Sequence, residues 1–176
     1  MTSMLNKNST VTYLPGCSPF DAPQVAEKET VVVTSVASDS HTWNLVYLQL
    51  LIEELGYEVV NLGPCVPDEL MVSECRDIDP AMVVISSVNG HGYQDGMRVV
   101  GQLREALGDT PMVIGGKLGI AAGGDTSFLD ELLEAGFDDV FEDGVRGVEE
   151  FKAFVASIPA RTARRTATVT PLRRVA

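Results

Sequence analysis

An aspartate and a histidine lie two residues apart in the segment Ser38-Asp39-Ser40-His41-Thr42-Trp43-Asn44. A carboxylate at this spacing can accept one ring N–H of the imidazole, which fixes the tautomer and raises the basicity of the other nitrogen. That arrangement is typical of a metal-ligating histidine and also of a general base. The same residues suit a helix start, in which Asp39 or Ser40 caps the helix and His41 is merely exposed. The pair alone therefore leaves a metal ligand, a base and a helix cap open.

Two further segments combine small or polar residues in a way that suits a ligand. The first is Ser86-Ser87-Val88-Asn89-Gly90-His91-Gly92, where the hydroxyls can hydrogen-bond a heterocycle and the glycines allow close approach of the backbone. The second, residues 115–124, contains five glycines and two alanines. A bulky ligand can lie against such a wall, and Lys117 can either meet a phosphate or only solvate the surface. The alternatives are ordinary turns and, for His91, a surface position.

These segments must be positioned by the regular alternation of short apolar runs and helix-length amphipathic stretches. The expected strands are 30–36, 58–62, 81–88, 112–114 and 139–141, and the expected helices are 42–55, 68–76, 94–107, 127–135 and 145–157. Gly56, Gly108 and Gly136 follow apolar helical runs, as helix C-termini require. The first and third strands, in TVVVTSVA and AMVVISSV, are apolar almost throughout, which is typical of a parallel sheet covered on both faces.

Five such βα units predict an α/β fold, a flavodoxin-like (Rossmann-like) doubly wound five-stranded parallel sheet with strand order 2-1-3-4-5. In this fold ligands bind beyond the carboxyl ends of the strands, where all three segments lie. We expect residues 1–28 to form a flexible N-terminal segment, 29–158 the domain, and 159–176 a basic flexible tail.

Composition limits the possible functions. The 176-residue chain has a net charge of −12, and five of its 13 basic residues lie in the last 16, so residues 1–160 carry eight bases against 25 acids. Such an acidic body predicts no nucleic-acid partner. No apolar run is long enough for a membrane span, and no signal peptide is visible, so we expect a cytoplasmic protein without a membrane partner. Cys17, Cys65 and Cys75 form no CxxC pair and predict no zinc site.

Other uses of this fold lack their sequence requirements. No G-x-G-x-x-G follows the first strand, no P-loop is present, and the third strand ends in serines where a phosphoacceptor receiver domain would have an aspartate. A flavin-binding electron carrier of flavodoxin type remains an alternative, because Ser38, Ser40 and Thr42 supply hydroxyls after the first strand. A cofactor-free interaction module of the same fold is the other alternative.

Taken together, the three segments resemble the cobalamin-binding domain family, whose pattern is D-x-H-x-x-G, then S-x-L, then G-G. The matching segments are Asp39 to Asn44, Ser86-Ser87-Val88 and Gly115-Gly116, and the resemblance covers about residues 30–156. Within that family the chain most resembles the small subunits of glutamate (methylaspartate) mutases. The stretches VNLGPCVPDELMVSE, VVISSVNGHG and LLEAGFDDVFEDG carry this resemblance.

The resemblance implies a role for each residue of the pattern. The cofactor would be adenosylcobalamin, bound base-off/His-on, with His41 as the lower axial ligand of cobalt and Asp39 hydrogen-bonded to the distal nitrogen of that histidine. Ser86 would bond the buried benzimidazole, and Val88 would line its pocket. The remaining implied cofactor-binding residues are Gly115 and Gly116, which would admit the nucleotide tail, Gly90 and Gly92 under the corrin edge, and Ser40, Thr42 and Asn44 in the histidine loop.

Two positions depart from the family pattern. Asn44 replaces the glycine at the start of the first helix, where a side chain can crowd the nucleotide tail, and Val88 replaces leucine. The Asp39–His41 pair is intact, so we expect cofactor binding to survive.

The resemblance also implies a partner. Only about 28 residues without helical periodicity precede the first strand, too few for the helical bundle that covers the upper face of the cofactor in corrinoid methyltransfer proteins. A larger barrel subunit carrying the substrate site would close that face. The chain would then be a non-autonomous subunit of an isomerase that rearranges carbon skeletons by radical chemistry, without turnover of its own.

Overall fold

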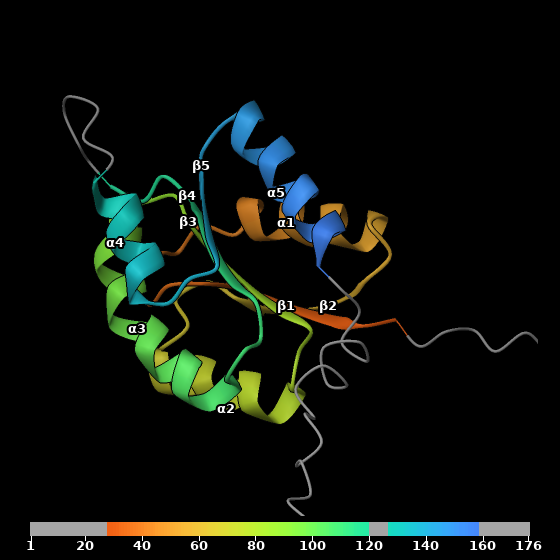
Figure 1. The fold of residues 1–176 in the computed structure, drawn as a ribbon, viewed down its shortest axis with the longest axis horizontal. Helices are drawn as coiled ribbons and strands as arrows, with labels where there is room; N and C mark the ends of the chain where they lie inside the picture. The colour runs from red at the N-terminus through yellow and green to blue at the C-terminus, as the bar shows by residue number, and fades with distance from the viewer. Residues whose placement is uncertain (1–27, 120–126, 159–176) are drawn as a thin grey trace, which may run out of the picture.

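A computed structural model of the chain describes residues 28–119 and 127–158, which form one parallel sheet covered by helices on both faces (Figure 1). The elements are β1 (Thr30–Ser35), α1 (Trp43–Glu54), β2 (Glu58–Gly63), α2 (Asp68–Ile78), β3 (Met82–Ser87), α3 (Gly92–Leu107), β4 (Met112–Gly116), α4 (Ser127–Ala135), β5 (Asp139–Glu142) and α5 (Val145–Ser157). The strand order is β2-β1-β3-β4-β5, with every neighbouring pair parallel. The predicted fold class and strand order are confirmed.

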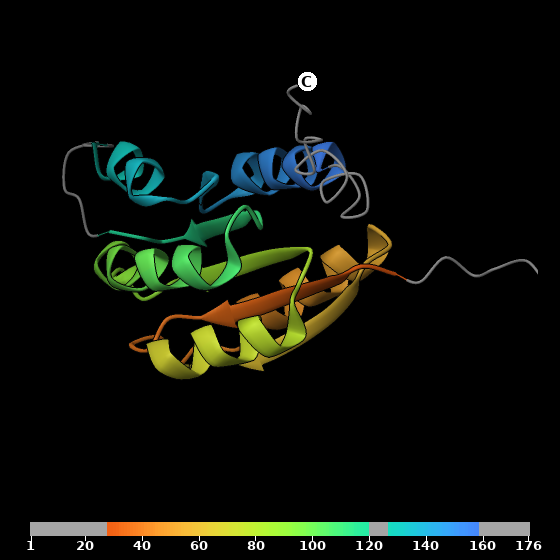
Figure 2. The ribbon, with the colours of Figure 1, turned by 60° about the horizontal axis from the view of Figure 1, so that its bottom comes forward.

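The sheet separates two apolar cores. Side chains of β1 alternate between them, with Val32 packing in the core under α2, α3 and α4, and Val31 and Val33 in the core under α1 and α5. Figure 1 shows the two groups of helices on opposite faces, and Figure 2 shows α4 and α5 at the same end of the sheet, flanking β5. Because β1 and β3 are buried on both faces, their sequences contain the near-continuous apolar runs from which the parallel sheet was predicted.

Helix and strand ends agree with the predicted ones within a few residues. Gly56, Gly108 and Gly136 all have positive φ, as predicted for residues that follow helices. The strand β4 is longer than predicted, because Gly115 and Gly116 continue the ladder, pairing with Ser86 and Ser87 on one side and with Phe141 and Glu142 on the other. An ordinary turn was one alternative for this glycine pair, and the structure instead places both glycines in the sheet.

Three predicted segments fall wholly or partly outside the described residues. They are the N-terminal segment 1–28, of which only Lys28 is described, the tail 159–176, and residues 120–126 of the glycine-rich segment. Among the helices that the structure describes, none has the length and apolar character that crossing a bilayer requires.

Candidate functional site

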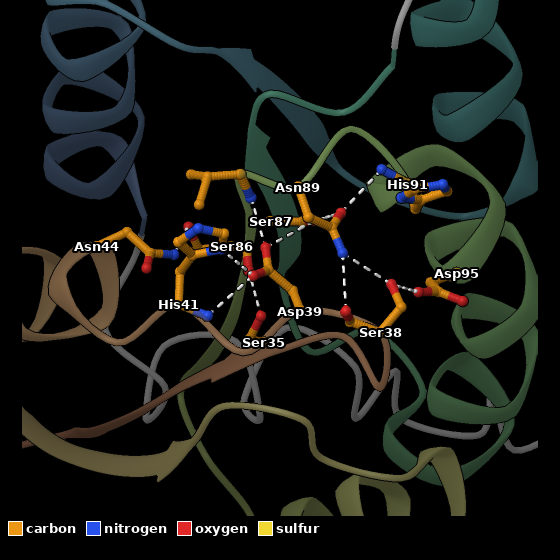
Figure 3. A network of polar contacts seen from close by, with 11 residues as sticks. Ser35, Ser38, Asp39, His41, Asn44, Ser86, Ser87, Asn89, His91 and Asp95 are labelled. Atoms are coloured by element: carbon orange, nitrogen blue, oxygen red, sulfur yellow. Dashed lines mark hydrogen bonds and ion pairs between the residues drawn. The ribbon is translucent and has the colours of Figure 1, made fainter.

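The site lies where β1 and β3, the two central strands, end side by side. Ser35 is paired with Ser86 in the sheet, and its hydroxyl donates a hydrogen bond of 2.8 Å to the Ser86 carbonyl. The loops that follow these strands, one with Asp39 and His41 and the other with Val88 and Asn89, therefore meet at the carboxyl edge (Figure 3). This is the switch point at which ligands bind in doubly wound sheets.

Asp39 is fully buried and holds the two loops together. Its Oδ1 accepts hydrogen bonds from the His41 backbone N–H at 3.0 Å and contacts the His41 Nδ1 at 2.7 Å. Its Oδ2 accepts from the Val88 N–H at 2.6 Å and the Ser87 hydroxyl at 3.1 Å. Burial raises the pKa of this carboxyl, but the hydrogen bonds lower it by more, so the net pKa lies below its usual value. The carboxylate is ionised at neutral pH.

Among the described residues, the His41 ring is hydrogen-bonded only through Nδ1. With Nδ1–H donating to Asp39, the other ring nitrogen, Nε2, carries the lone pair, and the side chain is 48% exposed. The residue at the N-cap of α1 is Thr42, which makes no side-chain capping bond. Asp39 and Ser40 therefore do not cap the helix, and the arrangement suits an oriented ligand or base.

A second polar group lies on the α3 side of the site. Asn89 donates from Nδ2 to the Ser38 carbonyl at 2.9 Å and hydroxyl at 3.0 Å, and its Oδ1 accepts from the Ser87 hydroxyl at 3.1 Å and the His91 N–H at 2.8 Å. The Ser38 hydroxyl in turn donates to Asp95, which pairs with Arg98. Figure 3 shows this side as a continuous chain of bonds. It fixes the histidine loop against α3.

On the opposite side, toward α1 and α5, lies a cavity of about 440 Å³. Its size is within the range of small-molecule sites. Most of its walls are apolar, formed by Trp43, Tyr47, Leu48, Val84, Val88, Val113, Phe141, Val145, Val148 and Phe151. Polar and charged residues also line it, namely Asn44, Ser86, Glu142, Asp143, Glu149 and Lys152. A mostly apolar slot suits a flat heterocycle.

Asn44 and Ser86 meet in this cavity wall. Both are buried, and the Asn44 Nδ2 donates a hydrogen bond of 2.8 Å to the Ser86 hydroxyl. The Asn44 Oδ1 is buried and has no hydrogen-bond partner among the described residues. Asn44 departs from the family pattern and Ser86 belongs to it. Their contact, between residues 42 apart in the chain, was not predicted from the sequence.

The predicted glycines have structural reasons that differ from one another. A side chain on Gly116, which has φ +108°, would place its Cβ 2.4 Å from the Ser87 carbonyl oxygen, and one on Gly115 would be 2.9 Å from that of Phe141. Both glycines border the cavity. A Cβ on Gly92 would instead lie 2.7 Å from Leu118 and 2.8 Å from Ser87, so this glycine allows α3 to pack closely.

The structure brings five of the predicted residues to one cavity: Asn44, Ser86, Val88, Gly115 and Gly116. Asp39 and His41 do not line the cavity, but Asp39 accepts a hydrogen bond from Val88, which does. Ser40 and Thr42 are exposed in the same loop. The cavity lining does not include Gly90 or Gly92. Sequence reasoning missed Ser87, Asn89 and Asp95 as site residues. The signal available in the sequence for Asp95 was an acidic residue at the start of the helix expected at 94–107.

Comparison with protein families and curated proteins gives consistent matches. The family model described as B12 binding domain matches residues 29–152. The glutamate mutase sigma subunit of Halobacterium salinarum is 32% identical over 116 residues, which cover 66% of this chain and 78% of that protein. The glutamate mutase sigma subunit of Carboxydothermus hydrogenoformans is 31% identical over 125 residues, covering 70% of this chain and 90% of that protein.

Solved structures share the fold at lower identity. A cobalamin-binding protein from Desulfitobacterium hafniense DCB-2 superposes with a TM-score of 0.56 at 21% identity, covering 73% of this chain and 60% of that one. The methanol:cobalamin methyltransferase complex MtaBC from Methanosarcina barkeri gives a TM-score of 0.58 at 21% identity, covering 86% and 56% respectively. This chain thus spans less than two thirds of either structure.

Proposed function

Because the chain belongs to the B12-binding domain family, we propose that it is the cobalamin-binding small subunit of an adenosylcobalamin-dependent carbon-skeleton mutase of the glutamate (methylaspartate) type. The similarity to glutamate mutase sigma subunits supports this assignment, since the match extends over most of those proteins. The observation that carries the proposal is the Asp39–His41 contact of 2.7 Å beside an apolar cavity.

The residues present fit the cofactor in two respects. His41 presents a free Nε2 on a half-exposed ring, as a lower axial ligand of cobalt requires, and Asp39 fixes the tautomer. The cavity between α1 and α5 offers room for a nucleotide tail, and its buried Asn44 carbonyl oxygen lacks a partner. When bound, the cofactor supplies a Co–C bond whose homolysis starts radical chemistry.

The roles of this chain's own residues are binding and orientation. Asp39 holds the imidazole through Nδ1, which leaves Nε2 as the nitrogen that would bind cobalt. Ser86, buried in the cavity wall, would donate its hydroxyl proton to the base of the cofactor, because its oxygen already accepts from Asn44. Gly115 and Gly116 leave the wall without side chains where the tail passes.

We further infer a partner subunit. The half-exposed His41 and the 65% exposed Trp43 both lie at the carboxyl edge, where a partner chain packed on this edge would cover them together with a bound cofactor. A larger barrel subunit that carries the substrate site would cover the upper side. The chain alone is expected to show no turnover, and the barrel subunit should co-purify with it better when cobalamin is present.

The proposal is tested by mixing the purified chain with hydroxocobalamin and recording the visible spectrum. We expect retention of the cofactor with base-off, histidine-ligated features. The change His41→Ala should remove the histidine-ligated features, because the ring is the proposed cobalt ligand. The matched control is His91→Ala, which removes an exposed imidazole at the start of α3 and should leave the spectrum unchanged.

Two results would overturn the proposal. One is the absence of binding at high micromolar cobalamin in a folded chain. The other is a His41→Ala variant whose cobalamin spectrum equals that of the wild type, because another group would then be the ligand.

A further inference from the structure

The outer face of α1 carries an apolar stripe that no described residue covers. Its four side chains are between 47% and 65% exposed, and they are Trp43, Val46, Tyr47 and Leu50. They lie three or four residues apart along the helix, so they are neighbours on one face. The opposite face of α1 packs in the core through Leu45 and Ile52. A helix that is apolar on both faces is typical of a buried element, so a further segment or chain is expected to cover this α1 stripe.

The α1 stripe is followed by acidic residues. Glu53 and Glu54 are the last two residues of the helix, and both are exposed. The two cations of the neighbouring helix α5 pair with glutamates of α5 itself. Among the described residues, neither Glu53 nor Glu54 forms an ion pair. A segment that complements this face therefore combines apolar side chains with positive charge.

The tail, residues 159–176, has this composition. It contains five arginines and no acid, and three apolar residues at a spacing of three, Val169, Leu172 and Val175. Arginine can also bind the faces of aromatic rings such as those of Trp43 and Tyr47. Charge disfavours the other occupants that the chain could supply. Residues 1–27 have one lysine and two acids, and residues 1–160 of a second copy would bring 25 acids against eight bases.

The tail also starts beside α1. The cavity is lined from both α1 and α5, so these helices are neighbours. Ile158, which follows α5, has extended backbone and packs on the same core as Leu48 of α1. The stripe from Trp43 to Leu50 is about 11 Å long, whereas the 18 residues of an extended tail span about 60 Å. The tail is therefore long enough to contact the whole stripe.

We propose that in the isolated chain the tail binds the outer face of α1, with its apolar side chains on the stripe and its arginines toward Glu53 and Glu54. The contact is intramolecular and needs no cofactor, so it goes beyond the proposed function and does not rest on it. The match to the B12-binding domain ends at residue 152, so the tail is an addition to the family domain.

The test uses the fluorescence of Trp43, which is the single tryptophan of the chain and therefore reports on this face alone. Quenching of the full chain by acrylamide is measured without cofactor, because an uncharged quencher does not respond to the charge of the tail. One variant reverses four charges of the tail together: Arg164→Glu, Arg165→Glu, Arg173→Glu and Arg174→Glu. If the tail covers the stripe in most wild-type molecules, the quenching constant should be at least about twofold higher in this variant, and its emission should shift to the red.

Two further variants serve as controls. Changing the same four arginines to lysine keeps the charge and should keep the quenching constant low. Changing Glu53 and Glu54 to lysine in the chain with the wild-type tail should raise the quenching constant, because like charges then meet. Combining these two lysines with the four glutamates of the reversed tail should lower it again, since opposite charges are restored.

Three results would overturn the proposal. The first is equal quenching of the wild type and the charge-reversed variant, because the tail would then not cover Trp43. The second is a combined variant that stays as accessible as the two single changes. The third is protection of Trp43 that is lost on dilution together with a dimer mass in light scattering, because a second copy would then be the occupant. None of these measurements involves cobalamin, so each result leaves the proposed function in place.

Discussion

The site has two sides that use similar residues in different ways, and the two asparagines show the contrast. On the α3 side, Asn89 makes four hydrogen bonds with its amide, two as donor and two as acceptor. On the cavity side, Asn44 makes one, and its carbonyl oxygen is buried without a partner among the described residues. Asp39 lies between them, with both carboxylate oxygens in use. The α3 side is complete before any ligand binds, and the cavity side is not.

The difference indicates that the two sides have different roles in ligand binding. A ligand that must be presented at a fixed angle, such as the His41 ring, needs neighbours whose own positions are already fixed by hydrogen bonds. A pocket that receives a base needs apolar walls and a small number of polar groups whose bonds are completed on binding. The α3 side provides the first, through Asp39, Ser87 and Asn89. The cavity side provides the second, through Ser86 and Asn44.

The largest loss of stability is expected from Asp39→Ala, which removes the carboxylate that joins the hydrogen bonds of the α3 side. The Val88 N–H and the His41 N–H and ring then lose their partner, while the Ser87 hydroxyl keeps its bond to Asn89. At about 1–3 kcal/mol for each buried group left unpaired, the free energy of unfolding should fall by about 3 kcal/mol. Urea unfolding followed by circular dichroism measures this change.

The matched control for Asp39→Ala is Asp109→Ala, which removes an exposed carboxylate from the turn between α3 and β4. Its free energy of unfolding should stay within about 0.5 kcal/mol of the wild type. Equal losses in the two variants would show that Asp39 does not hold the α3 side together.

Much of the fold could be predicted from the sequence because its signals are local. The apolar runs of β1 and β3 and the glycines after helices, such as Gly56, each depend on a few neighbouring residues. The strand order then follows from the number of βα units and the rules of parallel sheets. The Asp39–His41 contact could be foreseen as one alternative for the same reason, since the two residues lie two apart in one loop.

The rest of the site depends on contacts between residues far apart in the chain. Ser87 bonds Asp39 from 48 residues away, Asn44 bonds Ser86 from 42, and Ser38 bonds Asp95 from 57. No spacing rule in a single sequence specifies such pairs, because they arise only once β1, β3 and α3 are packed. The resemblance to a family placed Ser86 in the pocket, but it could not foresee the partner of Asn44, since the family pattern has glycine there.

An intermediate effect is expected from truncating the two asparagines in turn. Asn89→Ala should lower the free energy of unfolding by about 1–2 kcal/mol, because four bonds at a partly buried position are lost. Asn44→Ala should change it by no more than about 0.5 kcal/mol, because the lost bond to Ser86 is offset by removal of an unpaired buried carbonyl. Parallel urea titrations of the two variants give the comparison directly. If Asn44→Ala destabilised the chain as much as Asn89→Ala, hydrogen bonds would stabilise the cavity side as much as the α3 side.

The smallest effect is expected from acid, because opposing causes set the pKa of Asp39. Burial raises that pKa, while the hydrogen bonds from His41, Val88 and Ser87 lower it by more. The folded pKa is therefore below the unfolded value of about 3.9, and the ionised carboxylate stabilises the fold fully above that pH. This contribution is lost as the pH falls through the folded pKa. The difference in free energy of unfolding between the wild type and Asp39→Asn should narrow as the pH falls below about 4. The difference in free energy of unfolding between the wild type and Asn44→Ala should not depend on pH. The bond of the Asn44 side chain is to the Ser86 hydroxyl, and no carboxylate among the described residues bonds it. If the difference in free energy of unfolding between the wild type and Asp39→Asn stayed constant down to pH 3, the ionised form of Asp39 would not stabilise the α3 side.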